Sequence, residues 1–137
     1  MTACNISFSL TAGQIKARQK TVTRRFGWWN LQPGTVLTGI GEVGNGDKAE
    51  KICLIRIVSV RPEPLRFMLE DRLYGQRECE LEGFPDMSPE EYVSMRLKKH
   101  GVITDKICNR IYFEYLDEEV GNEIKKSITQ KAKKTTG

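Results

Sequence analysis

The chain has 137 residues, of which 39% are hydrophobic and 29% charged, and its formal net charge is +4. This length fits one domain with a single core, and no apolar run approaches the ~20 residues that cross a bilayer. We therefore expect a single soluble domain. Because the first residues lack the basic start and apolar stretch of a signal peptide, we expect a cytoplasmic protein.

The first predicted elements are a strand and a short helix. The sequence alternates from Asn5 to Leu10, which places Ile6, Phe8 and Leu10 on one face of a half-buried strand. Thr11 then provides a capping residue for a short helix.

Three further strands are predicted downstream. A Pro33-Gly34 turn leads into a strand from Thr35 to Ile40, in which Gly39 indicates a bulge or a close backbone approach. The strongest pattern, from Ile52 to Val60, carries apolar residues on both faces, so we expect it to run through the core. A last strand is predicted from Arg110 to Leu116.

Helices are predicted between the last two strands. Residues Leu65 to Leu69 favour a short helix. Ser88-Pro89-Glu90-Glu91 then combines a capping residue, a proline at the first helical position and a carboxylate at the third, and Gly101 ends this helix. Its apolar residues between Tyr92 and Leu97 are expected to pack on the sheet rather than line a ligand site. The acid-rich stretch from Glu70 to Glu91 is interpreted as a linker.

These elements predict an α+β domain over residues 1–116. Several strands with two or three short helices, without regular alternation, favour a mixed sheet curled into a small barrel with helices at its ends. Residues 117–137 form a lysine-rich tail with few apolar residues, which we expect to be a frayed helix or disordered.

The charge distribution indicates the kind of ligand. The segment from Met1 to Gly41 carries five lysines or arginines and no carboxylate, and its centre is Lys20-Thr21-Val22-Thr23-Arg24-Arg25. Uncompensated cations near Trp28 and Trp29 suit a ligand that is both anionic and flat, as nucleotides are. We therefore predict a nucleoside or RNA as the partner.

No metal or cofactor is predicted. The four cysteines lie far apart without a Cys-x-x-Cys pair, and His100 is the only histidine. This pattern argues against a structural zinc site. In a reducing compartment, scattered thiols serve as small apolar core residues.

The motifs resemble the ASCH superfamily, which has a PUA-like barrel. The resemblance covers Asn5 to Leu116 and depends mainly on the Lys-Thr-x-Thr-x-Arg string at Lys20 and on Glu82-Gly83-Phe84-Pro85 before the capped helix. The chain departs from the pattern at Arg18-Gln19, where many members have glycine and a basic residue. The resemblance implies a cleft for RNA or a nucleoside and, in some small bacterial members, an amidohydrolase that acts on N4-acylated cytidines such as N4-acetylcytidine.

The resemblance also implies catalytic residues. The lysine, the threonine three positions later and the distant glutamate of those enzymes match Lys20, Thr23 and Glu82, with Glu78 and Glu80 as alternatives for the glutamate. Thr23 would attack the amide. Lys20 acts as a base only when neutral, and burial lowers the pKa of an amine whereas a nearby carboxylate such as Glu82 raises it.

Geometry restricts the arrangement of the motif. Residues three apart point to opposite faces of a strand, so Lys20 has to lie in a turn before it. Thr21, Thr23 and Arg25 would then share the ligand face, while Arg24 would lie near the rim. We predict substrate-binding roles for Thr21, Arg24, Arg25, Trp28 and Trp29.

Other functions stay open at this point. The main alternative is a non-catalytic RNA-binding domain with the same cleft. A ribonuclease is less favoured, because a single histidine provides no pair of imidazoles for acid and base. Trp28 and Trp29 could equally cover the core, and His100 fits a favourable charge at a helix end.

Overall fold

The computed structural model describes residues 4–42 and 49–116, so the predicted tail lies outside the described residues. One sheet has the strand order β1-β3-β4-β5-β2, in which β1 is parallel to β3 and the other pairs are antiparallel. The sheet is therefore mixed, as predicted. The strands are β1 (Asn5–Ser7), β2 (Val22–Arg25), β3 (Val36–Glu42), β4 (Ala49–Pro64) and β5 (Ile107–Tyr115).

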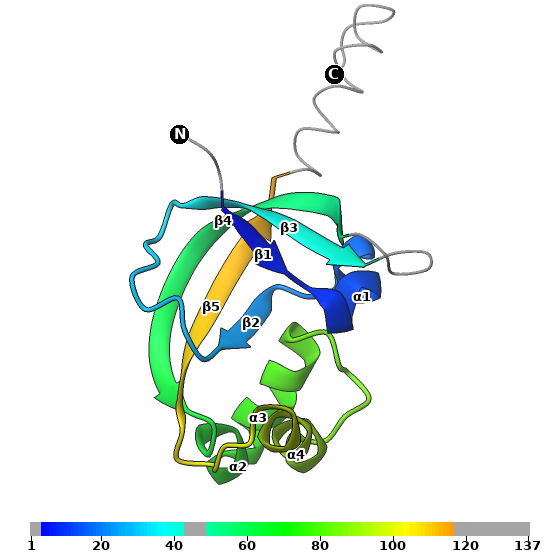
Figure 1. The fold of residues 1–137 in the computed structure, drawn as a ribbon. Helices are drawn as coiled ribbons and strands as arrows, with labels where there is room; N and C mark the ends of the chain where they lie inside the picture. The colour runs from blue at the N-terminus through cyan, green and yellow to red at the C-terminus, as the bar shows by residue number, and fades with distance from the viewer. Residues whose placement is uncertain (1–3, 43–48, 117–137) are drawn as a thin grey trace, which may run out of the picture.

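The sheet is strongly curled around the long strand β4 (Figure 1). The first half of β4 pairs with β3 and the second half with β5, and the pairing shifts register at Gly39 and again after Ile57. Such bulges increase strand twist. The register shift at Gly39 confirms the predicted bulge, and a Cβ on Gly39 would lie 2.9 Å from the Cys53 side chain at Sγ. At the far edges, Arg25 Nη2 donates to the Ser7 carbonyl at 2.6 Å and links β2 to β1.

The part of the chain with described structure holds four α-helices and one 3-10 helix, more than the two or three predicted. They are η1 (Ser9–Thr11), α1 (Ala12–Lys16), α2 (Phe67–Glu70), α3 (Arg72–Leu81) and α4 (Pro89–His100). Helices α2, α3 and α4 gather at one end of the sheet, whereas α1 lies apart from them (Figure 1). None of the described helices has the length and apolar character needed to span a membrane.

Two apolar clusters form the core. The larger lies inside the curled sheet and includes Ile55 and Ile57 of β4 and Phe113 of β5, so the prediction that β4 runs through the core is confirmed. The smaller cluster joins the helices through Met68, Cys79, Tyr92 and Val93.

The first strand is shorter than predicted. After Phe8, whose amide donates to the Ile40 carbonyl at 2.7 Å, the chain turns into η1. Leu10 consequently lies 59% exposed instead of sharing the buried face of Ile6 and Phe8. Alternation of apolar residues does not reveal where a strand stops.

The predicted acidic linker is helix α3, so that prediction is wrong. The Asp71 carboxylate caps the helix by accepting a hydrogen bond from the Tyr74 amide at 3.1 Å. Few apolar residues mark α3 in the sequence, because two of the acids here, Glu78 in the helix and Glu82 after it, are themselves buried. Their partners come from distant strands.

Helix α4 begins and ends as predicted. Ser88 and Glu91 form the reciprocal capping box, and Gly101 takes the left-handed conformation at the end. The packing prediction is wrong, however, since Tyr92 and Val93 contact Met68 and Cys79 of the neighbouring helices rather than the sheet. Helical periodicity identifies a buried face but not the element that covers it.

Candidate functional site

A pocket of about 230 Å³ lies between the β2 region, the η1 turn and helix α4. Lys20, Thr23 and Arg25 line it from the β2 side, and Glu82 lines it from the end of α3. Side chains of α4 form the opposite wall. The three candidate catalytic residues, which are distant in the sequence, therefore share one pocket.

Lys20 is a buried cation with two bonds to one residue. Its side chain is 3% exposed, and Nζ donates to the Glu82 carbonyl at 2.9 Å and to Glu82 Oε1 at 2.8 Å. Lys20 precedes β2, as the geometry of the motif required. The Tyr115 hydroxyl donates a hydrogen bond to the Lys20 carbonyl, and the Thr21 amide donates to the Leu81 carbonyl at 2.8 Å. These two bonds fix the turn on both sides.

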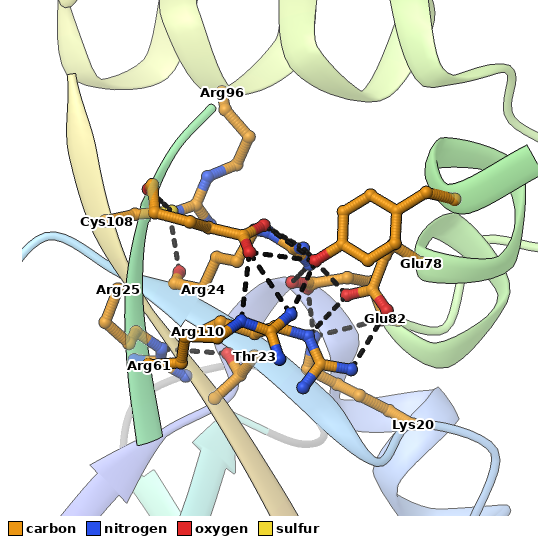
Figure 2. Close-up of polar contacts among 12 residues, drawn as sticks. Lys20, Thr23, Arg24, Arg25, Arg61, Glu78, Glu82, Arg96, Cys108 and Arg110 are labelled. Atoms are coloured by element: carbon orange, nitrogen blue, oxygen red, sulfur yellow. Dashed lines mark hydrogen bonds and ion pairs between the residues drawn. The ribbon is translucent and has the colours of Figure 1, made fainter. Parts of the chain in front are cut away.

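Glu82 joins two cations. Its Oε1 accepts from Lys20, and its Oε2 accepts from Arg24 Nη1 at 3.3 Å (Figure 2). The chain reverses at Gly83, where φ is +97° and an added Cβ would lie 3.3 Å from Lys20 Cβ. Glycine at this position thus allows the backbone of Glu82 to approach Lys20 closely.

Burial and pairing shift the pKa values of this pair. Burial lowers the pKa of Lys20 below its usual 10.5, although Glu82 opposes the shift. Burial alone would raise the pKa of Glu82, but the Lys20 and Arg24 charges outweigh it and hold that pKa below 4.5. Glu82 is therefore ionised near neutral pH, and Lys20 loses its proton more easily than a lysine in water.

The Thr23 hydroxyl lies beside a guanidinium group. Arg25 Nε donates to Thr23 Oγ1 at 2.9 Å, and both residues line the pocket (Figure 2). The predicted common face of Thr21, Thr23 and Arg25 is therefore confirmed for Thr23 and Arg25, whereas Thr21 precedes β2 and does not line the pocket. Burial lowers the pKa of Arg25 to about 10, with the charge of Arg96 adding to the shift and Glu82 opposing it.

Arg24 lies on the opposite face of β2 and is fully buried, which corrects the prediction that it lies near the rim. It forms ion pairs with Glu63 at 2.7 Å, Glu78 at 2.7 Å and Glu82 at 3.3 Å. Figure 2 labels Glu78 and Glu82 beside Arg24. Strand alternation turns Arg24 away from Thr23, and carboxylates from β4 and the α3 region make the burial of its charge possible.

The same carboxylates bind other cations. Arg110 of β5 forms a bidentate pair with Glu78 at 2.7 and 2.9 Å. Glu63 accepts hydrogen bonds from the Tyr74 hydroxyl and from Arg61. We refer to Arg24, Arg110, Glu63, Glu78 and Glu82 as the buried ion network. It connects β2, β4 and β5 to the α3 region.

The network distinguishes the three acids that the sequence left open. Glu78 is committed to Arg24 and Arg110, and Glu80 is exposed on the outside of α3. Glu82 is the one of the three that lines the pocket. Sequence composition had presented all of them as surface charges.

Sequence reasoning missed the wall formed by α4. Tyr92, Met95, Arg96, Lys99 and His100 line the pocket, and their spacing of three, four, seven and eight residues from Tyr92 is that of one helix face. This spacing is visible in the sequence, but it mixes apolar and basic residues, so hydrophobicity alone did not identify it.

The aromatic residues at the pocket also differ from those predicted. Phe8, Phe26 and Phe84 line it, whereas Trp28 and Trp29 do not. Trp28 packs on the core and its carbonyl accepts a hydrogen bond from Asn109 at 2.8 Å.

Four predicted binding residues have no support from the pocket, and one of them, Arg24, is held in the buried ion network instead. Trp29 is 54% exposed, and neither it, Trp28 nor Thr21 is among the residues that line the pocket. Their binding roles stay predictions.

Acid should destabilise the protein through the buried carboxylates. The pKa values of Glu78 and Glu82 are both lowered from 4.5, so their contribution is present above the unfolded pKa and is lost as pH falls through the folded values. We expect the free energy of unfolding, measured with urea, to be level at about pH 5–7 and to fall below about pH 4.5. Glu78→Gln should reduce this fall and Glu114→Gln, in an exposed pair, should not. Equal acid sensitivity in all three proteins would contradict the account.

The chain has no match among family models and none among curated proteins. Among solved structures, it is similar to the hypothetical protein PH0355, with 16% identity over 83% of this chain and 99% of that chain and a TM-score of 0.56. It is also similar to EF3133 from Enterococcus faecalis V583, of the DUF984 family, with 14% identity over 80% of this chain and 68% of that chain and a TM-score of 0.53.

An ASCH domain from Lactobacillus crispatus JV V101 is also similar, with 17% identity over 83% of this chain and 80% of that chain and a TM-score of 0.47. At sequence identities this low, the similarity to PH0355 and EF3133 shows the fold alone. The chain has the predicted α+β fold with a mixed, curled sheet, and it shares this fold with the first two structures.

Proposed function

We propose that the chain is an ASCH-type amidohydrolase that removes the acyl group from N4 of an acylated cytidine. The observation that carries the proposal is the shared pocket of Lys20, Thr23 and Glu82, in which Lys20 and Glu82 form a buried ion pair. A nucleophile, a proton acceptor and a group that holds it are the parts that amide hydrolysis needs.

Thr23 acts as the nucleophile. Lys20 in its neutral form takes the hydroxyl proton, and Thr23 Oγ1 forms a bond to the acyl carbon. The bond between that carbon and N4 then breaks, and N4 receives the proton from Lys20. Water hydrolyses the resulting ester and regenerates Thr23. The Arg25 guanidinium, 2.9 Å from Oγ1, favours negative charge on that oxygen.

The Lys20–Glu82 pair provides the proton acceptor. Transfer of one proton over the 2.8 Å between Nζ and Oε1 converts the ion pair into a neutral amine and a neutral acid. The Lys20 and Arg24 charges keep Glu82 ionised in the free protein. Burial lowers the cost of forming the neutral pair, and substrate binding adds to burial by displacing water.

Tyr92 supplies a hydrogen-bond donor. Its hydroxyl is buried at the pocket, where the Glu82 carboxylate is its neighbour. Burial and the Glu82 charge raise its pKa well above the usual value, so the hydroxyl stays protonated. A protonated hydroxyl at the pocket can donate a hydrogen bond to the oxyanion that develops at the acyl carbonyl.

The pocket also suits a pyrimidine. Its size is below the ~300–1,000 Å³ of ordinary ligand sites, which favours a small ligand group over a bulky one. The rings of Phe26, Phe84 and Tyr92 at its walls can contact a flat base.

Incubation with N4-acetylcytidine tests the proposal. We expect the purified protein to release cytidine and acetate, separated by chromatography, whereas a boiled sample should not. The second candidate, a non-catalytic RNA-binding domain, is favoured by the basic residues at the pocket. It predicts salt-sensitive RNA binding in fluorescence anisotropy without any cytidine release. Absence of release from folded protein would therefore reject the hydrolase in favour of the binding domain.

Glu82→Gln should shift the pH dependence of turnover. Because Glu82 raises the pKa of Lys20, its removal should lower that pKa, and the rising limb of kcat/KM should move to lower pH. The pKa itself can be followed through the Lys20 Cε signal in carbon NMR. If that pKa falls but turnover disappears, Glu82 carries the proton. A limb that stays in place or moves to higher pH would contradict the assignment of Lys20 as the base.

A further inference from the structure

We propose that the mouth of the pocket also binds a phosphate group, so that an N4-acylated cytidine nucleotide binds more tightly than the bare nucleoside. Four residues form this cationic mouth: Arg25 of β2 and Arg96, Lys99 and His100 of α4. The identity of the base rests on the proposed function. The phosphate site is an additional claim, argued from charge and geometry.

The cationic mouth is assembled from two elements that meet across the pocket. Arg96, Lys99 and His100 follow one another at spacings that place them on one face of α4. The Phe26 ring lies between two of them, with its centroid 4.8 Å from that of His100 and 5.2 Å from Arg96 Cζ. Contact with Phe26 therefore holds these two basic side chains near the end of β2.

The charges of the cationic mouth are not balanced within the pocket. Among the described residues that line it, Lys20, Arg25, Arg96 and Lys99 are cationic and Glu82 is the one carboxylate. Glu82 is already paired with Lys20 and Arg24. Arg25 and Arg96 instead make hydrogen bonds with neutral oxygen atoms, including the Ser7 and Arg24 carbonyls at 2.6 Å each.

The pKa of His100 reflects its burial and the nearby positive charges. Burial lowers its pKa, and the charges of Arg96, Lys99 and Arg25 lower it further. The groups that act on the imidazole are these three cations, from α4 and β2, and the ring of Phe26, which directly follows β2. Clustered cations repel one another, and a bound dianion would relieve that repulsion.

Arg96 adds a second observation. Its Nε is buried and has no hydrogen-bond partner within the described structure, although Nη2 is anchored on the Arg24 carbonyl. Figure 2 shows Arg96 extending from its helix toward β2. A buried donor on a fixed guanidinium suits a phosphate oxygen. The carbonyl end of α4 disfavours anions, so the side chains have to supply the attraction.

The single histidine allows a direct test with the whole protein. We would follow the imidazole proton signal of His100 by NMR against pH, without ligand and with cytidine, cytidine 5′-monophosphate or inorganic phosphate. The monophosphate should raise the pKa of His100 and bind about tenfold or more tightly than cytidine, and cytidine should leave that pKa unchanged. A short RNA that matches the monophosphate would assign the source as an RNA phosphate.

Two variants assign the effect to the cationic mouth. Arg96→Met and Lys99→Met should each reduce the advantage of the monophosphate over cytidine while cytidine affinity stays within about twofold. Lys98→Met provides the matched control, since Lys98 is exposed on the same helix and does not line this pocket. Lys99→Met keeps the test open if Arg96→Met fails to fold.

The possible failures are distinguishable. Equal binding of cytidine and its monophosphate, with an unmoved pKa at His100, would overturn the phosphate site and leave the hydrolase proposal intact. If phosphate compounds raise the pKa but cytidine does not bind and N4-acetylcytidine is not hydrolysed, the phosphate site stands and the proposed function fails.

Discussion

Replacing Arg24 with methionine is expected to reduce the free energy of unfolding by about 3–5 kcal/mol, the usual cost of removing one partner from a buried ion pair. Arg24 is fully buried and bonded to Glu63, Glu78 and Glu82, and methionine would leave these carboxylates with fewer cations. Urea unfolding monitored by tryptophan fluorescence measures the loss.

Two comparison variants define the cause. Arg56→Met removes an exposed pair with Glu114, whose side chains are 44% and 49% exposed, and should cost no more than about 1 kcal/mol. Arg24→Lys keeps the charge but loses the planar guanidinium group, so its loss of stability should lie between those of Arg24→Met and Arg56→Met. If Arg24→Met is as stable as Arg56→Met, the buried ion network does not exist as described.

Replacing Lys20 with methionine is expected to lower the rate of N4-acetylcytidine hydrolysis by about 10²–10⁴-fold, the usual contribution of a positioned base. The fold should tolerate this change better than Arg24→Met, because Glu82 keeps its pair with Arg24. The expected result is thus a folded but inactive protein, measured by cytidine release beside urea unfolding.

Lys20→Arg separates charge from proton transfer. It keeps a cation opposite Glu82 but cannot give up its proton near neutral pH, so it should also be inactive. Lys51→Met, which removes an exposed lysine of β4, should leave the rate unchanged. Full turnover in folded Lys20→Arg would remove Lys20 from the proton-transfer step.

Local signals predicted much of this fold correctly. The alternation and apolar content of β4 and β5 identified the centre of the sheet, and Ser88 with Glu91 identified the start of α4. These signals act between residues close in sequence, so one chain is enough to read them. The same holds for the shared face of Thr23 and Arg25 on β2.

Long-range pairing explains the main errors. Glu78 appeared to be a surface acid because nothing near it in the sequence indicates that Arg24 and Arg110 cover it. Arg24 appeared to be a rim residue for the same reason. A charge can be buried when its partner arrives from a distant strand, and composition contains no record of such a partner.

The choice of aromatic residues failed for another reason. Trp28 and Trp29 stand close to the basic motif in sequence, but the pocket is lined by Phe26 and by Phe84 and Tyr92 from the helical region. Sequence proximity to a motif is a weak guide to a site that is completed by a helix some 70 residues away.

Cytidine release by Thr23→Ala, compared with the unmodified protein under the same conditions, tests the central claim most directly. The variant should release no cytidine above background although nucleoside binding persists, Thr23→Ser should recover part of the activity, and Thr38→Ala, at a half-buried position of β3, should keep all of it. Release by folded Thr23→Ala at the unmodified rate would contradict the claim that this hydroxyl performs the attack.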